Sequence, residues 1–134
     1  MENRNTIKYF IWISLLILSD CSTGKLACYK VSPNDIADID LILKKNNSFV
    51  IYFKVFEDMP PEKYTFTGNW NEKADMIRLN FKLNKQDLPD LYALFDPALD
   101  ETKSIRILDK KTVEFKKSLR KINIWGLSCE KKIR

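Results

Sequence analysis

Three cysteines, Cys21, Cys28 and Cys129, are the most reactive side chains of this 134-residue chain, which contains no histidine. Without histidine the chain cannot build Ser-His-Asp or Cys-His nucleophile arrangements, and it lacks the commonest metal ligand. The sequence also holds no C-x-x-C, G-x-x-x-x-G-K-[ST] or G-x-G-x-x-G motif. We therefore expect a protein that binds and does not catalyse, with no cofactor and no metal site.

The fate of the cysteines depends on the N-terminal segment. Residues 10–18 carry no charge, only Ser14 among them is polar, and they follow a lead that contains Arg4 and Lys8. A helix that spans the hydrocarbon core needs about twenty apolar residues, whereas the apolar region of a secretory signal has about 7–15. The pattern favours a signal peptide over residues 1–20 and an exported chain. A buried helix at the start of a globular domain is the alternative.

Two cleavage patterns overlap after the apolar run. Leu18-Ser19-Asp20-Cys21 resembles the bacterial lipobox, in which a cysteine accepts lipid, although Asp20 stands where Gly, Ala or Ser is usual. Small residues at Ser22 and Gly24 fit ordinary signal-peptidase cleavage after Gly24 instead. We predict lipid attachment at Cys21 and a membrane-anchored envelope protein. A soluble secreted or periplasmic protein is the alternative.

The two remaining cysteines are expected to form a disulfide. In an oxidising compartment Cys28 and Cys129 are left to pair once Cys21 carries lipid. In the loop-entropy model, closing a loop of about 100 residues stabilises a fold by at most 4–5 kcal/mol. Two buried free thiols are the alternative.

The chain is basic, and its net charge of +5 does not change when residues 1–20 are removed. Lys116, Lys117, Arg120 and Lys121 form one basic cluster. This cluster predicts a face for an acidic protein partner or an anionic surface, with a solvated strand face as the alternative. No nucleic-acid recognition motif is present, so nucleic acid is not an expected partner.

Aromatic residues offer a pocket hypothesis. Trp70 and Trp125, with Tyr92 and Phe95, could line a site for one small apolar ligand, which a small barrel can hold. Packing of these rings in a filled core is the alternative.

The elements that must position these residues are short apolar or alternating segments separated by polar turns, which is the pattern of an all-β protein. Gly68 inside one of them predicts a bulge or a sharp bend. Strands are expected at residues 25–31, 39–45, 49–56, 64–70, 76–82, 104–108, 112–117 and 122–132, with a helical turn at 32–39 and a short helix or ordered loop at 84–103. The expected fold is a small antiparallel up-and-down barrel, or a barrel-like sandwich, of about eight strands, because closure removes exposed edges.

The segment from residue 39 to residue 115 resembles small bacterial envelope lipoproteins with lipocalin-like barrels, such as META-like domains and the N-terminal barrel of the copper-resistance lipoprotein family. The resemblance lies in an F…G-x-W…D-x-I-x-L cadence, formed here by Phe66, Gly68, Trp70, Asp75, Ile77 and Leu79. It implies a lipocalin-like β-barrel domain over residues 21–134. The cysteine-pair motif of the copper-resistance family is absent, so no copper-binding or catalytic residue is carried over.

These observations together predict an exported, lipid-anchored binding protein of the bacterial cell envelope. The alternative is a soluble secreted barrel that acts as an inhibitor or immunity-type protein, or that carries a small apolar ligand.

Overall fold

The computed structural model describes residues 24–57, 59–82, 88–99 and 104–132. The strands are β1 (Lys25–Val31), β2 (Ala37–Lys44), β3 (Ser48–Val55), β4 (Glu62–Lys73), β5 (Met76–Phe81), β6 (Ile105–Ile107), β7 (Thr112–Lys116), β8 (Lys121–Ile124) and β9 (Leu127–Lys132). A helix, α2 (Leu91–Phe95), and a 3-10 turn, η1 (Pro97–Leu99), connect β5 to β6. Within these ranges no helix is long and apolar enough to cross a membrane. The signal segment 1–20 and Cys21 lie outside the described residues.

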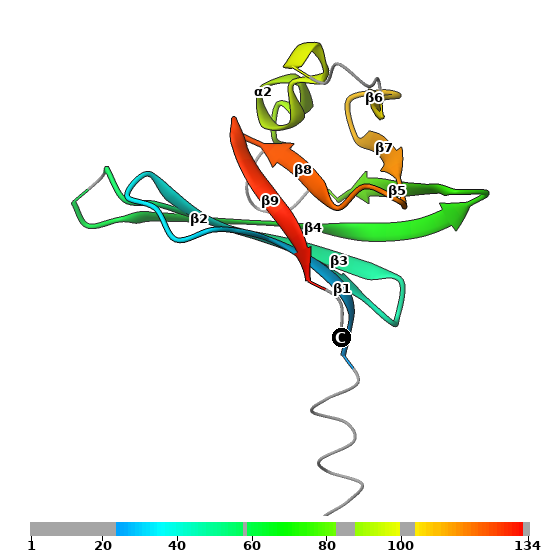
Figure 1. Cartoon of the computed structure of the whole chain (residues 1–134), viewed down its shortest axis with the longest axis horizontal. Coiled ribbons are helices and arrows are strands. Elements are labelled where there is room, and N and C mark those ends of the chain that lie inside the picture. The colour runs from blue at the N-terminus through cyan, green and yellow to red at the C-terminus, as the bar shows by residue number, and fades with distance from the viewer. Residues whose placement is uncertain (1–23, 58, 83–87, 100–103, 133–134) are drawn as a thin grey trace, which may run out of the picture.

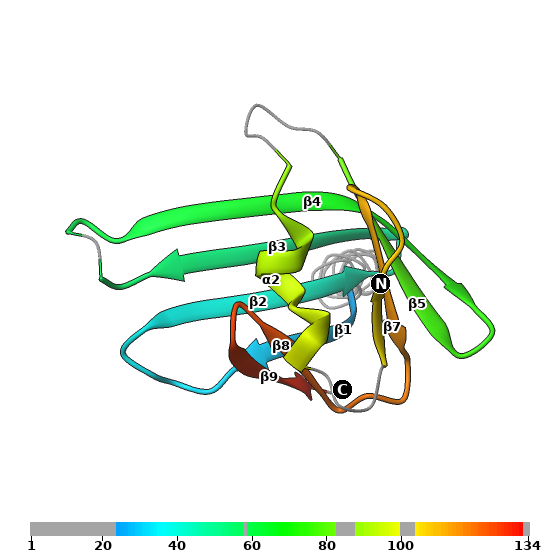
Figure 2. The same ribbon diagram turned by 90° about the horizontal axis from the view of Figure 1, so that it is seen from above.

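The nine strands form one antiparallel sheet in the order β6-β7-β5-β4-β3-β2-β1-β9-β8. The sheet curls into a half-barrel, and α2 lies across its concave side (Figures 1 and 2). The all-β, antiparallel prediction is confirmed. The two ends of the sheet are β6 and β8.

The core fills the concave side of the sheet. Alternate residues of each strand point into it because successive side chains of a strand face opposite sides. In β2, for example, Ile39 and Leu41 are fully buried, whereas Asp38, which points to the opposite face, is exposed. Helix α2 closes the core by adding Leu91, Leu94 and Phe95 to the same buried cluster. The helix is therefore held by its apolar side chains and fixes the position of the segment around it.

Gly68 is required by a close contact and not by a bulge. The register is unbroken through Gly68, which pairs with Phe49 on one side and Phe81 on the other, so the predicted bulge is not formed. A Cβ atom at this position would lie 1.9 Å from the carbonyl oxygen of Asn80 and 2.7 Å from the ring of Phe49. Only glycine lets the two strands and the ring approach this closely.

The predicted helical turn at residues 32–39 is wrong. Asn34 organises this segment instead: its Oδ1 accepts hydrogen bonds from the backbone N–H groups of Ile36 (2.8 Å) and Ala37 (2.9 Å). Its amide nitrogen donates to the carbonyl of Ser32 at 2.8 Å. Asparagine side chains compete in this way with the backbone bonds of a helix. Strand β2 can then begin at Ala37.

The single strand predicted at residues 122–132 is two strands, β8 and β9, joined by a two-residue turn. Ile124 pairs directly with Leu127, which leaves Trp125 and Gly126 as the turn. This hairpin raises the number of strands from the predicted eight to nine.

A buried carboxylate ties three strands together on the convex side. Glu114 of β7 is 3% exposed and pairs in register with Arg78 of β5 and Arg106 of β6. Arg78 Nη2 donates to Glu114 Oε2 at 3.2 Å, and Arg106 Nε donates to Oε1 at 3.0 Å. Hydrogen bonds from Arg106 and then Arg78 lower the pKa of Glu114, although burial opposes them. The three side chains act as a structural ion cluster.

Candidate functional site

Trp125 stands at the turn between β8 and β9 in an uncommon conformation. Its φ is 54° and that of Gly126 is 76°, the positive values that two-residue hairpin turns require. Asparagine or glycine usually occupies such positions, and a bulky side chain there is uncommon. The indole ring is 41% exposed. An exposed tryptophan held in a strained backbone conformation is a feature that points to function.

Two contacts fix Trp125 in place. Its backbone N–H donates to the carbonyl oxygen of Leu94 in α2 at 2.6 Å, which joins the hairpin turn to the helix. Its ring packs edge-to-face on Phe53 of β3, with centroids 5.1 Å apart and planes at 73°. The ring therefore has a defined position between the helix and the sheet, although much of it is open to solvent.

A groove of about 470 Å³ lies beside Trp125; we call it the Trp125 groove. It is lined by Phe53, Val55, Glu57, Tyr64, Phe66, Pro89, Asp90, Ala93, Leu94 and Trp125. The sheet register builds its floor, because Phe53 of β3 pairs with Tyr64 of β4 and their rings meet edge-to-face at 6.5 Å. The groove thus combines side chains from β3, β4, α2 and the β8–β9 turn.

Carboxylates are among the residues that line this groove. Glu57 and Asp90 line it and both are exposed. Glu62 is linked to the groove because its Oε2 accepts a hydrogen bond from the Tyr64 hydroxyl. Asp90 also caps α2, since its Oδ1 accepts from the backbone N–H of Tyr92 at 3.1 Å. No lysine or arginine is among the lining residues.

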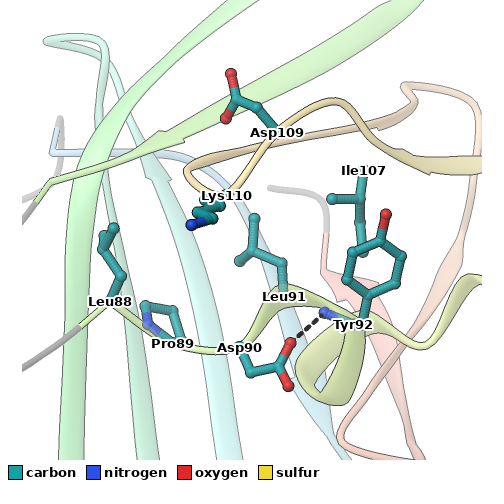
Figure 3. Close-up of a pocket in the computed structure, with 8 residues that line it drawn as sticks. All are labelled: Leu88, Pro89, Asp90, Leu91, Tyr92, Ile107, Asp109 and Lys110. Atoms are coloured by element: carbon teal, nitrogen blue, oxygen red, sulfur yellow. Dashed lines mark hydrogen bonds between the residues drawn. The ribbon is translucent and has the colours of Figure 1, made fainter.

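A second groove, of about 410 Å³, lies beside the segment that leads into α2 (Figure 3). It shares Pro89 and Asp90 with the Trp125 groove. Tyr92 and Ile107 line it, as do Asp109 and Lys110 from the β6–β7 turn (Figure 3). The Trp125 groove is lined by two carboxylates and no cation, whereas the second groove is lined by two carboxylates, Asp90 and Asp109, and one lysine.

The structure separates the two tryptophans that the sequence placed in one pocket. Trp125 lines the groove described above, whereas Trp70 is 7% exposed, belongs to the core and lines neither groove. The indole N–H of Trp70 donates to the carbonyl oxygen of Lys44 at 2.8 Å. Phe95 is also a core residue, and Tyr92 contributes to the second groove. Trp125 therefore lines a groove, whereas Trp70 packs in the core.

The predicted disulfide between Cys28 and Cys129 is not formed, and both cysteines are free thiols. Cys129 pairs with Val31, three residues beyond Cys28 in β1, so the two thiols belong to opposite faces of the sheet. Cys129 is fully buried, and this burial, helped by the charge of Asp40, raises the pKa of its thiol to about 12.

The predicted basic face lies at the corner between β7 and β8, where Lys116, Lys117, Arg120 and Lys121 are all exposed. Two of the four are engaged in ion pairs, Lys117 with Glu72 at 2.7 Å and Lys121 with Glu130 at 3.7 Å. Part of the positive charge is therefore balanced locally.

Within the described ranges, no group of three Cys, Asp or Glu side chains is placed to hold a metal ion. No family model, curated protein or solved structure matches this chain.

Proposed function

We propose that this chain is a binding protein of the bacterial cell envelope, exported by its N-terminal segment and anchored by lipid at Cys21, and that its β-domain takes a small apolar ligand in the Trp125 groove. The observation that carries the binding role is a groove of about 470 Å³ with two part-exposed aromatic rings, Tyr64 and Trp125, on its walls. Ligand sites in proteins have volumes of about 300–1,000 Å³ and are lined mainly by apolar and aromatic groups.

The groove suits binding and not a reaction. Its lining residues include no serine, threonine or cysteine that could act as a nucleophile. Its floor is built on paired strands and on a helix held by core contacts, so the site is formed before a ligand arrives. Preformed sites bind with a smaller entropic cost.

The export and anchoring parts of the proposal are supported by the sequence alone, through the apolar run at residues 10–18 and the lipobox-like Leu18-Ser19-Asp20-Cys21. The half-barrel supports a lipocalin-like arrangement, in which a curled sheet holds a ligand at its concave side. Intact mass of the protein from the membrane fraction tests the anchor. A species that begins at Cys21 with added acyl mass is expected, and a soluble species that begins near Lys25 would contradict it.

The binding role is tested with a neutral apolar dye, N-phenyl-1-naphthylamine. The full-length protein is held in nanodiscs of zwitterionic lipid, and the signal from empty nanodiscs is subtracted. We expect saturable dye fluorescence that Trp125→Ala weakens by about tenfold or more, which corresponds to about 1.4 kcal/mol. Tyr52→Ala is the matched control, because Tyr52 is 50% exposed and does not line the groove. Equal dye binding by the wild type and Trp125→Ala would contradict ligand binding in the Trp125 groove.

An inhibitor role is a second candidate, favoured by the four exposed cations at the β7–β8 corner. Its test is capture of an acidic protein partner by the wild type and by Lys116→Glu/Arg120→Glu. These two positions are chosen because Lys117 and Lys121 are already paired with Glu72 and Glu130. A partner that is lost with the double variant supports this role, and a partner retained at equal yield contradicts it.

A further inference from the structure

The Trp125 groove has a charge opposite to that of the whole chain. The protein carries a net charge of +5, yet Glu57 and Asp90 line the groove and no lysine or arginine does. Glu62 adds a third carboxylate through its hydrogen bond with the Tyr64 hydroxyl. The local field at this groove therefore attracts cations, although the net charge of the chain would repel them.

The aromatic walls of the groove reinforce this selection. Trp125 is 41% exposed and Tyr64 is 37% exposed, so part of each ring is open to a ligand. An aromatic face attracts an ammonium group, and tryptophan is the strongest of the aromatic residues in this respect. The chain already uses such contacts internally: Lys131 Nζ lies 5.9 Å from the ring centroid of Tyr29, and Lys54 Nζ lies 5.7 Å from that of Phe56. Carboxylates and aromatic faces at one site together form the pattern that recognises an apolar cation.

The second groove provides an internal contrast. It shares Pro89 and Asp90 with the Trp125 groove, but Lys110 also lines it (Figure 3). Lys110 offsets one of the two carboxylates that line the second groove, Asp90 and Asp109, so weaker cation selection is expected there than in the Trp125 groove.

We propose that the ligand of the Trp125 groove is a small organic cation, an apolar body with an ammonium group, whose apolar part lies against Phe53 and Phe66 and whose charge faces Glu57, Asp90 and the ring of Trp125. This inference rests on the proposed binding function and adds the charge of the ligand to it.

The test compares three probes with the same apolar ring: naphthylethylamine, naphthylethanol and naphthylpropionate, which are positive, neutral and negative at pH 7. Each competes with N-phenyl-1-naphthylamine for the full-length protein in zwitterionic nanodiscs. We expect the ammonium probe to displace the dye at about tenfold lower concentration than the alcohol, and the carboxylate probe to require more than the alcohol. Raising the ionic strength from about 0.05 M to about 0.5 M should shrink the preference, because salt screens exposed charges.

Two double variants locate the effect. Glu57→Gln/Asp90→Asn should reduce the preference for the ammonium probe over the alcohol to about twofold or less, and the fold should be retained because asparagine still caps a helix. Asp35→Asn/Asp109→Asn removes the same two charges from exposed sites outside the groove and should keep the tenfold preference.

The outcomes separate this inference from the proposed function. Displacement by the alcohol and the ammonium probe at equal concentrations would overturn the charge selection and leave apolar binding standing. Tightest binding of the carboxylate probe would overturn it as well, because the net charge of the chain would then dominate. If the dye itself does not bind, the proposed function fails and the inference fails with it.

Discussion

The two ends of β4 place similar residues in different environments. Tyr64, Phe66, Gly68 and Trp70 all project from one face of this strand, yet Trp70 is 7% exposed and Tyr64 is 37% exposed. At the Trp70 end the strand pairs with Phe49 and Phe81 through Gly68, and Trp70 belongs to the buried core. At the Tyr64 end the strand borders the Trp125 groove. One amphipathic strand thus supplies residues to both the core and the proposed ligand site. The difference in exposure between Trp70 and Tyr64 depends on which elements cover each end of the strand.

The largest expected effect is at the core end. Trp70→Ala should lower the free energy of unfolding by about 3–5 kcal/mol, because it removes a buried aromatic ring and leaves a cavity. Urea unfolding at equal m-values measures this loss. Trp70→Phe, which keeps a ring in the core, should cost less. If Trp70→Ala lowers the free energy of unfolding by less than about 1 kcal/mol, Trp70 is not part of the cooperative core, and the proposed difference between the two ends of β4 is wrong.

The same comparison applies to carboxylates. Glu114 is buried between two arginines, so Glu114→Gln should cost about 1–3 kcal/mol at pH 7. Glu57 is exposed in the groove, and Glu57→Gln should change stability by less than about 0.5 kcal/mol.

The pH dependence follows from the lowered pKa of Glu114 in the folded state. Because the unfolded chain binds this proton more readily, the stabilisation by Glu114 is present above the unfolded pKa of about 4.3 and is lost as pH falls through the lower folded pKa. Chemical unfolding between pH 7 and pH 3 should therefore show a smaller acid-induced loss in Glu114→Gln than in the wild type. Parallel curves for the two proteins would show that the ion cluster does not stabilise the fold.

A substitution at Trp125 separates stability from binding. Trp125→Asn places at the turn a residue that tolerates positive φ, which offsets the lost contact with Phe53. We expect the free energy of unfolding to change by less than about 1 kcal/mol while dye affinity falls by about tenfold. A large loss of stability with unchanged dye affinity would make Trp125 a structural residue like Trp70.

The smallest expected effect concerns a core tyrosine. Tyr29 is fully buried, its hydroxyl has no hydrogen-bond partner among the described residues, and burial raises its pKa to about 12. Tyr29→Phe should therefore stabilise the fold by about 1 kcal/mol at pH 7.

Alkaline titration gives an independent measure of the same residue. An unfolded tyrosine ionises near pH 10, whereas Tyr29 keeps its proton to about pH 12, so the free energy of unfolding falls as pH rises between these values. Tyr29→Phe should flatten this part of the stability curve, and Tyr52→Phe at an exposed position should not. Equal alkaline losses in the wild type and Tyr29→Phe would contradict the assignment.

Much of the fold could be predicted from the sequence because inward and outward residues alternate along the strands. The clean alternation in β4 and β5, for example, gave both the hairpin and its buried face. The errors came from local chemistry. Pro33 after Ser32 indicated a helical turn, but the side chain of Asn34 holds the segment in another conformation. The turn between β8 and β9 was not predicted, because tryptophan is rarely found at positive φ.

The site was harder to predict than the fold because it depends on register and on which side chains are covered. Trp125 was identified, but its partners Phe53, Tyr64 and Glu57 come from segments that only the three-dimensional pairing brings together. The disulfide prediction failed for a related reason. Counting cysteines cannot show that Cys28 and Cys129 project from opposite faces of the sheet, since this follows from the pairing of β1 with β9.

The strands at the two ends of the sheet are its two shortest, with three residues in β6 and four in β8. Each offers a neighbouring chain only a few unpaired backbone groups, which is one way in which natural sheets avoid edge-to-edge aggregation. Lys121 at the start of β8 adds a charge that discourages pairing further. The chain can thus leave its sheet open without closing it into a full barrel.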